Sequence, residues 1–143
     1  MFTEREQIIE VVNRLFVYTD AQNWEGLLSE VFAEEVTFDM SSMGAGPATI
    51  IPAKDICKMW EAGFEGLDAV HHQAGNYLVT VKQDEATVFA YAIAFHYKKV
   101  ATAGNTRSFT GSYDLHLVKS AEGWRIDSFK YNLKIADGNV DFK

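Results

Sequence analysis

The chain has 143 residues, 48% of them hydrophobic, which is enough apolar material for one core, and we expect residues 1–143 to form a single domain. Thirteen Lys and Arg residues against 20 Asp and Glu residues give a net charge of −7, with no basic run that could neutralise phosphates. We therefore expect no nucleic-acid partner.

The apolar stretches are far shorter than the roughly 20 residues of a membrane span, and the charged start does not resemble a signal peptide. These features predict a soluble, cytoplasmic protein that binds no membrane.

Motifs for metal, nucleotide and covalent chemistry are absent from the sequence. Cys57 is the only cysteine, which excludes an internal disulfide and a cysteine-based zinc site. There is no His-x-His or His-x-x-Glu-His spacing, no phosphate-binding loop, no dinucleotide fingerprint and no Gly-x-Ser-x-Gly motif. We therefore expect no metal site and no cofactor. The aromatic content, in contrast, is high at 13%.

The first half of the chain is predicted to be mainly helical. Thr3 and Glu6 form a capping-box pattern that begins a first helix with one apolar stripe. Asn23 is placed to cap a second helix, from Trp24 to about Phe32.

A short strand is predicted over residues 36–40, followed by a loop over 41–51 that is rich in glycine and serine. Pro52 suits the first turn of a third helix, which we expect to end at Gly66. The remainder predicts four long strands, at about 70–82, 86–99, 108–119 and 123–134. Helices early and neighbouring strands late predict an α+β fold, a cone in which a strongly curved, mostly antiparallel sheet wraps around three N-terminal helices.

The strand predicted over 86–99 is apolar on both faces. One face carries bulky side chains, namely Phe89, Tyr91, Ile93, Phe95 and Tyr97. The other face carries His96 and the small side chains Ala90, Ala92 and Ala94, which leave room either for a ligand or for close helix packing. The bulky face is too large to leave in water, and we expect a homodimer to form through it.

The hairpin that follows places His96 opposite Gly111 and Ala94 opposite Tyr113, if it closes symmetrically near residue 103. In this register His96 and Tyr113 face the hollow of the cone, whereas His116 lies on the surface or at an interface. A slip of one residue would exchange the two faces.

His71 and His72 are adjacent on a predicted strand, so only one of them can face the hollow. On local pattern alone, each suits a solvated or structural role. Asp20 ends the first helix in a turn-like run, where its carboxylate suits capping.

Several short motifs, each weak alone, together resemble the SnoaL-like group of the nuclear transport factor 2-like superfamily over nearly the whole chain. In chain order they are Phe16-x-Tyr18-x-Asp20-x-x-Asn23-Trp24, Leu27-Leu28-x-x-Val31-Phe32-x-x-x-Val36-x-Phe38-Asp39, His71-His72-Gln73-x-Gly75-Asn76-x-x-Val79, Asp84-x-Ala86, Gly111-x-Tyr113 and Gly123-Trp124-Arg125-Ile126. This resemblance independently implies the cone fold.

Within that superfamily, the resemblance to scytalone dehydratases implies a catalytic aspartate and two strand histidines. Asp20, His71 and His96 match these positions, with His72 as a one-residue alternative to His71. The match is incomplete, because Met40 replaces a tyrosine of those enzymes and their carbonyl-polarising Ser and Asn fall near Gly111 and Tyr113. The ketosteroid isomerase branch fits less well.

The resemblance favours a cofactor-free dehydratase or isomerase for a small hydrophobic, cyclic or aromatic carbonyl compound. One histidine would remove a proton next to the carbonyl, and the other histidine or a water would protonate the leaving oxygen. The candidate substrate-binding residues are Tyr18, Phe38, Trp60, Phe64, His72 and Tyr113. The alternative is a non-catalytic module of the same fold that binds a small hydrophobic ligand.

Overall fold

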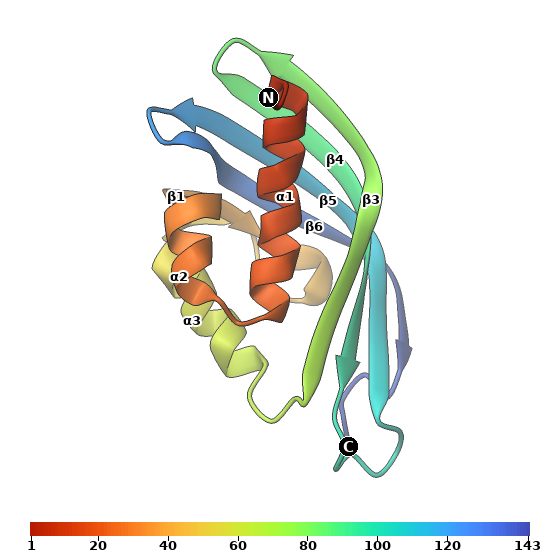
Figure 1. Cartoon of the computed structure of the whole chain (residues 1–143). Helices are drawn as coiled ribbons and strands as arrows, with labels where there is room; N and C mark the ends of the chain where they lie inside the picture. Colours follow the sequence, from red (N-terminus) through yellow and green to blue (C-terminus); the bar gives the residue numbers. More distant parts are fainter.

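Three helices lie against one face of a curved six-stranded sheet in the computed structural model, which describes residues 1–143 (Figure 1). The helices are α1 (Glu4–Asp20), α2 (Trp24–Gly26, continued by a π-helical turn at Leu27–Val31) and α3 (Ala53–Gly63). The strands are β1 (Phe32–Asp39), β2 (Thr49–Pro52), β3 (Ala69–Lys82), β4 (Glu85–Tyr97), β5 (Thr106–Ser120) and β6 (Gly123–Gly138). Their order is β2-β1-β6-β5-β4-β3, with β1 and β6 parallel and every other pair antiparallel. The predicted α+β cone is confirmed.

Local sequence signals set the starts of the helices. The hydroxyl of Thr3 accepts the backbone N–H of Glu6 at 3.1 Å, and the Glu6 carboxylate accepts the Thr3 hydroxyl rather than the Thr3 backbone amide. The Oδ1 atom of Asn23 accepts the backbone N–H of Gly26 at 2.9 Å. Both side chains satisfy amides that the first helical turn leaves without partners. None of the helices combines the length and the apolar composition that crossing a membrane requires.

Three predicted boundaries in the middle of the chain are wrong. The strand predicted over 36–40 begins at Phe32, as β1. The segment predicted as a loop over 41–51 contains most of β2, which pairs with β1. The glycines and serines before β2 favour a loop, and this signal was stronger than the preference of its β-branched residues for a strand. Helix α3 ends at Gly63, and Gly66 instead adopts a φ of 83° in the turn that follows.

The pairing of β4 with β5 is shifted along the strands from the predicted hairpin. His96 lies opposite Arg107, whereas we expected it opposite Gly111. A shift of four residues keeps every side chain on its face, because side chains alternate with a period of two. Tyr113 therefore faces the helices, as predicted, and His116 faces outward.

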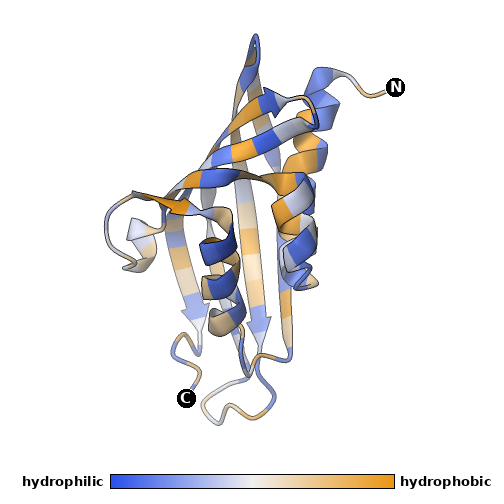
Figure 2. Cartoon of the chain, turned by 90° about the vertical axis from the view of Figure 1, so that its left-hand side faces the viewer, coloured by the Kyte–Doolittle hydropathy of each residue, from blue (hydrophilic) through white to orange (hydrophobic).

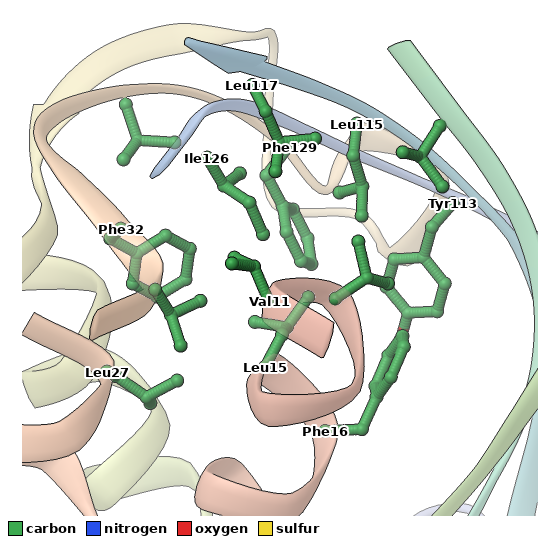
Figure 3. Packing of buried hydrophobic residues seen from close by; sticks show 14 of the residues in the cluster. Val11, Leu15, Phe16, Leu27, Phe32, Tyr113, Leu115, Leu117, Ile126 and Phe129 are labelled. Carbon is green, nitrogen blue, oxygen red and sulfur yellow. The ribbon is translucent and has the colours of Figure 1, made fainter. Parts of the chain in front are cut away.

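Bulges bend the sheet around the helices. The extra residue lies in β3 after Gly75, and in β6 at the two shifts opposite Thr110 and His116 of β5; each bulge increases the local bend. Side chains of α1, including Val11 and Leu15, point toward the concave faces of β5 and β6 (Figure 3). They belong to a cluster of 23 buried residues shared by the helices and the sheet.

The convex face of β4 is apolar and open to solvent. Along β4, buried alanines alternate with large exposed side chains, and a similar alternation of hydropathy runs along the neighbouring strands (Figure 2). The exposed fractions are 46% for Tyr91, 38% for Ile93, 47% for Phe95 and 39% for Tyr97. The predicted division of β4 into a small buried face and a bulky outer face is therefore observed.

Candidate functional site

A cavity of about 340 Å³ lies between the helices and the concave face of the sheet. Its volume falls within the usual range for sites that bind small molecules. Twelve of its 16 lining residues are hydrophobic, so it suits a mainly apolar ligand. The lining residues are Leu15, Phe16, Thr19, Met40, Met43, Trp60, Phe64, His72, Ala94, His96, Arg107, Phe109, Tyr113, Phe129, Tyr131 and Val140.

His72, which lines this cavity, forms a tight pair with Asp20. Asp20 is the last residue of α1, and its Oδ1 atom lies 2.5 Å from Nδ1 of His72. Its other oxygen, Oδ2, accepts the backbone N–H of His72 at 2.8 Å. The carboxylate is an acceptor only, so Nδ1 of the neutral imidazole carries the proton and Nε2 keeps its lone pair. The pair therefore fixes both the orientation and the tautomer of His72.

His96 has the opposite tautomer. Its Nδ1 atom accepts the Nε–H of Arg107 at 3.0 Å, so the proton of the neutral ring is on Nε2. Burial, then the positive charge of Arg107 and the nearby His72, lower the pKa of His96 to about 4, although Asp20 acts in the opposite direction. The ring is thus neutral at pH 7 and presents an N–H donor. Rings of Phe64 and Phe109 meet it edge-on, with centroids 5.7 and 5.5 Å away.

The two imidazoles project from neighbouring strands toward the same cavity. His72 pairs with Ala94, which precedes His96 by two residues, so both histidines lie on the concave face. The site therefore presents a hydrogen-bond acceptor, His72, and a hydrogen-bond donor, His96, to the same mainly apolar cavity.

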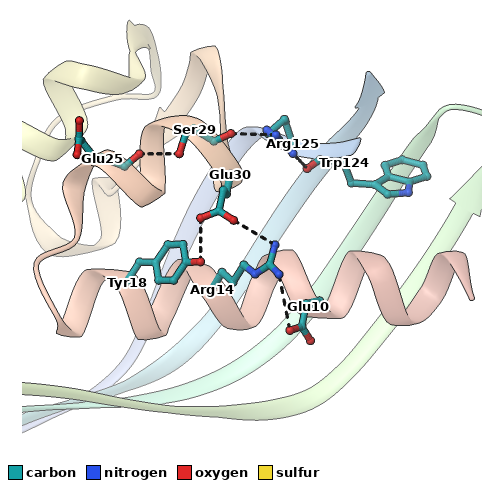
Figure 4. Close-up of polar contacts among 8 residues, drawn as sticks. All are labelled: Glu10, Arg14, Tyr18, Glu25, Ser29, Glu30, Trp124 and Arg125. Atoms are coloured by element: carbon teal, nitrogen blue, oxygen red, sulfur yellow. Dashed lines mark hydrogen bonds and ion pairs between the residues drawn. The ribbon is translucent and has the colours of Figure 1, made fainter. Parts of the chain in front are cut away.

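Four predicted site residues do not line the cavity, and one of them, Asp20, lies behind His72. His71 faces outward on β3, where its Nε2 atom lies 3.4 Å from Oε1 of Gln73, so His72 and not His71 lies beside Asp20. Tyr18 points away from the cavity and donates to Glu30 at 2.9 Å (Figure 4). Phe38 is buried behind the wall and stacks on Phe129 at 5.3 Å.

The other predicted ligand contacts, Trp60, Phe64, His72 and Tyr113, line the cavity together with His96. Sequence reasoning missed Arg107, Phe109 and Tyr131. Arg107 and Phe109 are separated from Tyr113 by even numbers of residues on the same strand, so their side chains face the same side of the sheet. This alternation could have predicted both residues.

No cluster of three or more His, Cys, Asp or Glu side chains is placed to hold a metal ion. The imidazoles at the cavity are each hydrogen-bonded to a charged group, His72 to Asp20 and His96 to Arg107.

The lowered pKa of His96 predicts a pH-dependent stability. Between about pH 6.5 and 4, the unfolded chain binds a proton at His96 that the folded protein does not, so the free energy of unfolding should fall as the pH falls through this range. We expect a loss of about 2 kcal/mol, which is less than the full shift implies because the ring is partly solvated. Denaturant titrations at pH 7, 5 and 4 should show this loss in the wild type and not in His96→Asn.

His116 provides an internal comparison for that measurement. Burial lowers its pKa, but the hydrogen bonds and charges of Asp127 and Glu85 outweigh burial and raise the pKa overall. The stabilisation from His116 is therefore present at low pH and is lost as the pH rises, opposite in sign to that from His96. An equal pH dependence in the wild type and His96→Asn would contradict the buried, neutral His96.

Comparisons with known proteins give a family match and several structural neighbours. The SnoaL-like domain family matches residues 1–130. The protein Kfla4162 from Kribbella flavida has 28% sequence identity, with 97% of this chain and 95% of that chain covered and a TM-score of 0.90. No curated protein matches the chain at a significant level.

Two further neighbours come from Novosphingobium aromaticivorans. A proposed aromatic ring hydroxylase has 21% identity, a TM-score of 0.80, and coverage of 97% of this chain and 95% of that chain. A proposed scytalone dehydratase has 18% identity, a TM-score of 0.78, and coverage of 94% and 86%. A nuclear transport factor 2-like protein from Salmonella enterica, with 15% identity and a TM-score of 0.75, has the same cone fold. The family match agrees with the predicted resemblance, and the chain belongs to the SnoaL-like family.

Proposed function

We propose that the protein is a cofactor-free enzyme that moves a proton within a small, cyclic, largely apolar carbonyl compound, as a dehydratase or an isomerase. One observation carries this proposal: the Asp20–His72 pair and the Arg107-bound His96 present a proton acceptor and a neutral donor to one apolar cavity. A cavity that only retained a hydrophobic ligand would need neither a carboxylate-bound imidazole nor a partly buried guanidinium.

His72 is the general base of the proposed reaction. Its Nε2 lone pair takes a proton from the carbon next to the substrate carbonyl, and the electrons of that C–H bond form an enolate. Asp20 then faces an imidazolium cation, which its carboxylate stabilises while it holds the ring in place. Such a positioned base typically contributes about 10²–10⁴-fold in rate.

His96 polarises the substrate carbonyl. A neutral imidazole donates its Nε2–H to the oxygen on which negative charge develops, and Arg107 behind it adds a favourable positive charge. Because its Nδ1 is already bound to Arg107, His96 has no means of replacing a proton that it gives away. We therefore propose that it acts as a hydrogen-bond donor rather than as the acid that protonates the leaving oxygen.

The proton that His72 receives completes the reaction. If this proton passes to a β-hydroxyl group of the substrate, that group leaves as water and the enolate electrons form the new C=C bond, which is a dehydration. Returned to another carbon of the enolate system, it gives an isomerisation. In both cases the imidazole returns to its neutral form, so no oxidant, reductant or cofactor is needed.

The lining of the cavity favours a flat substrate. Aromatic side chains contribute much of its wall, among them Phe16, Trp60, Phe109 and Tyr113. The volume of about 340 Å³ suits a ligand of one or two rings. The fold is shared with a proposed scytalone dehydratase and a hexachlorocyclohexane dehydrochlorinase, and these two names support an elimination as the reaction class.

A panel of cyclic ketones with a β-hydroxyl group tests the proposal. The protein would be incubated with β-hydroxycyclohexanone and β-hydroxytetralone, and conversion to the enone or its aromatic tautomer would be followed by absorbance and NMR. We expect turnover of at least one bicyclic member. Saturable binding without product over pH 5 to 9 would instead support the alternative, a non-catalytic binding module.

We also propose that the convex face of β4 joins two copies of the chain. The exposed side chains there, including Tyr91, Phe95 and Tyr97, form a continuous apolar strip of a kind that is rarely left open in a soluble monomer. Light scattering should give twice the chain mass of 16.1 kDa for the wild type and the monomer mass for Phe95→Asp. A monomeric wild type at micromolar concentration would contradict this assembly.

A further inference from the structure

We propose that Arg107 is a positioning residue that fixes which nitrogen of His96 carries the proton, and that the segment after β6, Asn139–Lys143, holds Arg107 in place. Nothing in the sequence motifs drew attention to either feature. The consequence for the reaction rests on the proposed function, but the tautomer of His96 is a property of the protein without any substrate.

Arg107 and His96 are directly opposite in the β4–β5 ladder. Their side chains both project to the concave face, and the Nε–H of Arg107 points at Nδ1 of His96 at 3.0 Å. A guanidinium has donors only and stays protonated, so Nδ1 of His96 must accept. This contact leaves Nε2 as the protonated nitrogen.

The guanidinium is held on its remaining sides by residues that follow β6. Nη1 donates to the carbonyl oxygen of Val140 at 2.7 Å, and the centre of the guanidinium lies 4.3 Å from the ring centroid of Phe142. The negative charge of Asp141 also favours the cation. Since the guanidinium is planar and rigid, fixing Nη1 and one face also fixes the direction in which Nε–H points.

The segment Asn139–Lys143 is itself firmly anchored. The carbonyl oxygen of Lys143 accepts the backbone N–H groups of Thr102 and Ala103 at 2.9 and 3.1 Å, as well as the side-chain amide of Asn139 at 2.9 Å. Phe142 is only 8% exposed and has a φ of 50°, a left-handed conformation that a phenylalanine keeps only where surrounding contacts favour it.

Gly138 allows the chain to turn from β6 across Arg107. Its φ is 85°, and a Cβ atom at this position would lie 2.5 Å from the carbonyl oxygen of Thr106. The backbone can therefore pass close to the start of β5 only with glycine here. The segment is thereby brought over the residue that positions His96.

Without Arg107, His96 would lose its tautomer preference. Its neutral ring could then carry the proton on Nδ1 and present a lone pair to the substrate oxygen, which would repel the developing charge. The other charged or titratable groups near His96 are His72 and Asp20, whose effects on its protonation oppose each other. Neither donates a hydrogen bond to its Nδ1.

Long-range proton–nitrogen NMR spectra of the imidazoles test this inference on the unliganded protein. At pH 7 we expect His96 to have a protonated Nε2 and an unprotonated Nδ1. In Arg107→Met we expect both nitrogens to show averaged signals, and the midpoint of His96 protonation to rise by about one pH unit as the repulsive charge is lost. Signals of His96 that are unchanged in Arg107→Met, or a protonated Nδ1 in the wild type, would overturn the proposal.

Two further variants keep the test decisive. Phe142→Ala retains the charge of Arg107 but removes the ring beneath the guanidinium, so we expect a partial shift toward averaged signals of His96. This variant also tests the inference if Arg107→Met does not fold. Phe95→Ala, on the convex face, should leave His96 unchanged. If no substrate is turned over but the tautomer shift is seen, the proposed function fails and this inference stands. If a substrate is turned over but the tautomer does not shift, this inference fails and the proposed function stands.

Discussion

Replacing His72 by Gln is expected to lower kcat/KM for β-hydroxyketone dehydration by about 10²–10⁴-fold, the usual contribution of a positioned base. Gln fills a similar space and its amide can still donate to Asp20, but it offers no lone pair that binds a proton near neutral pH. The loss should therefore appear in kcat, with little change in ligand affinity or in the free energy of unfolding. Steady-state kinetics and denaturant titration of the same sample measure both.

His71→Gln is the matched control for His72→Gln. The two histidines are adjacent in the chain, but His71 lies on the outer face of β3 and does not contact Asp20. We expect His71→Gln to retain the rate of the wild type. Equal losses in the two variants, or a loss of less than tenfold in His72→Gln, would refute the role of His72 as base.

Phe129→Ala is expected to lower the free energy of unfolding by about 3–5 kcal/mol. The ring is 2% exposed and has three aromatic neighbours, Phe38 at 5.3 Å, Tyr113 at 5.4 Å and Trp60 at 5.7 Å between centroids. Removing it leaves a void between the core and the cavity, and the neighbouring rings cannot all collapse into that void. Urea or guanidinium titration with an unchanged slope would measure the loss directly.

Phe95→Ala removes the same atoms from the convex face, where Phe95 is 47% exposed. In the monomeric state we expect a change of less than about 1 kcal/mol, because little apolar area leaves the core. A loss of less than about 1 kcal/mol in Phe129→Ala, as small as that expected for Phe95→Ala, would show that the wall of the cavity is not part of the packed core.

The fold could be predicted from the sequence because its main signals are local. The Thr3 and Asn23 caps begin α1 and α2, and the alternation of small and bulky apolar side chains along residues 86–99 separates the two faces of β4. The pairing position of His96 could not be predicted, because alternation fixes the face of a side chain but not its partner along the strand. The error of four residues changed that partner to Arg107 and left the face correct.

The candidate site was predicted less completely because it depends on contacts between distant segments. The choice between His71 and His72 depends on the strand parity relative to Asp20, which lies 52 residues before His72 in the chain. Tyr18 was predicted to bind the substrate, but its place on α1 directs its hydroxyl to Glu30, away from the cavity. Arg107 owes its position to Val140 and Phe142, beyond the residues that carry any motif.

The most direct test of the account is exchange of the α-protons of tetralone, a ketone without a leaving group, in deuterated water. This measurement isolates proton removal by the Asp20–His72 pair from the later steps. We predict that the wild type accelerates deuterium incorporation next to the carbonyl, as seen by NMR, and that His72→Gln reduces incorporation to the rate in buffer. Incorporation by the wild type at the buffer rate despite measured binding, or equal incorporation by His72→Gln, would contradict the claim that His72 is the base.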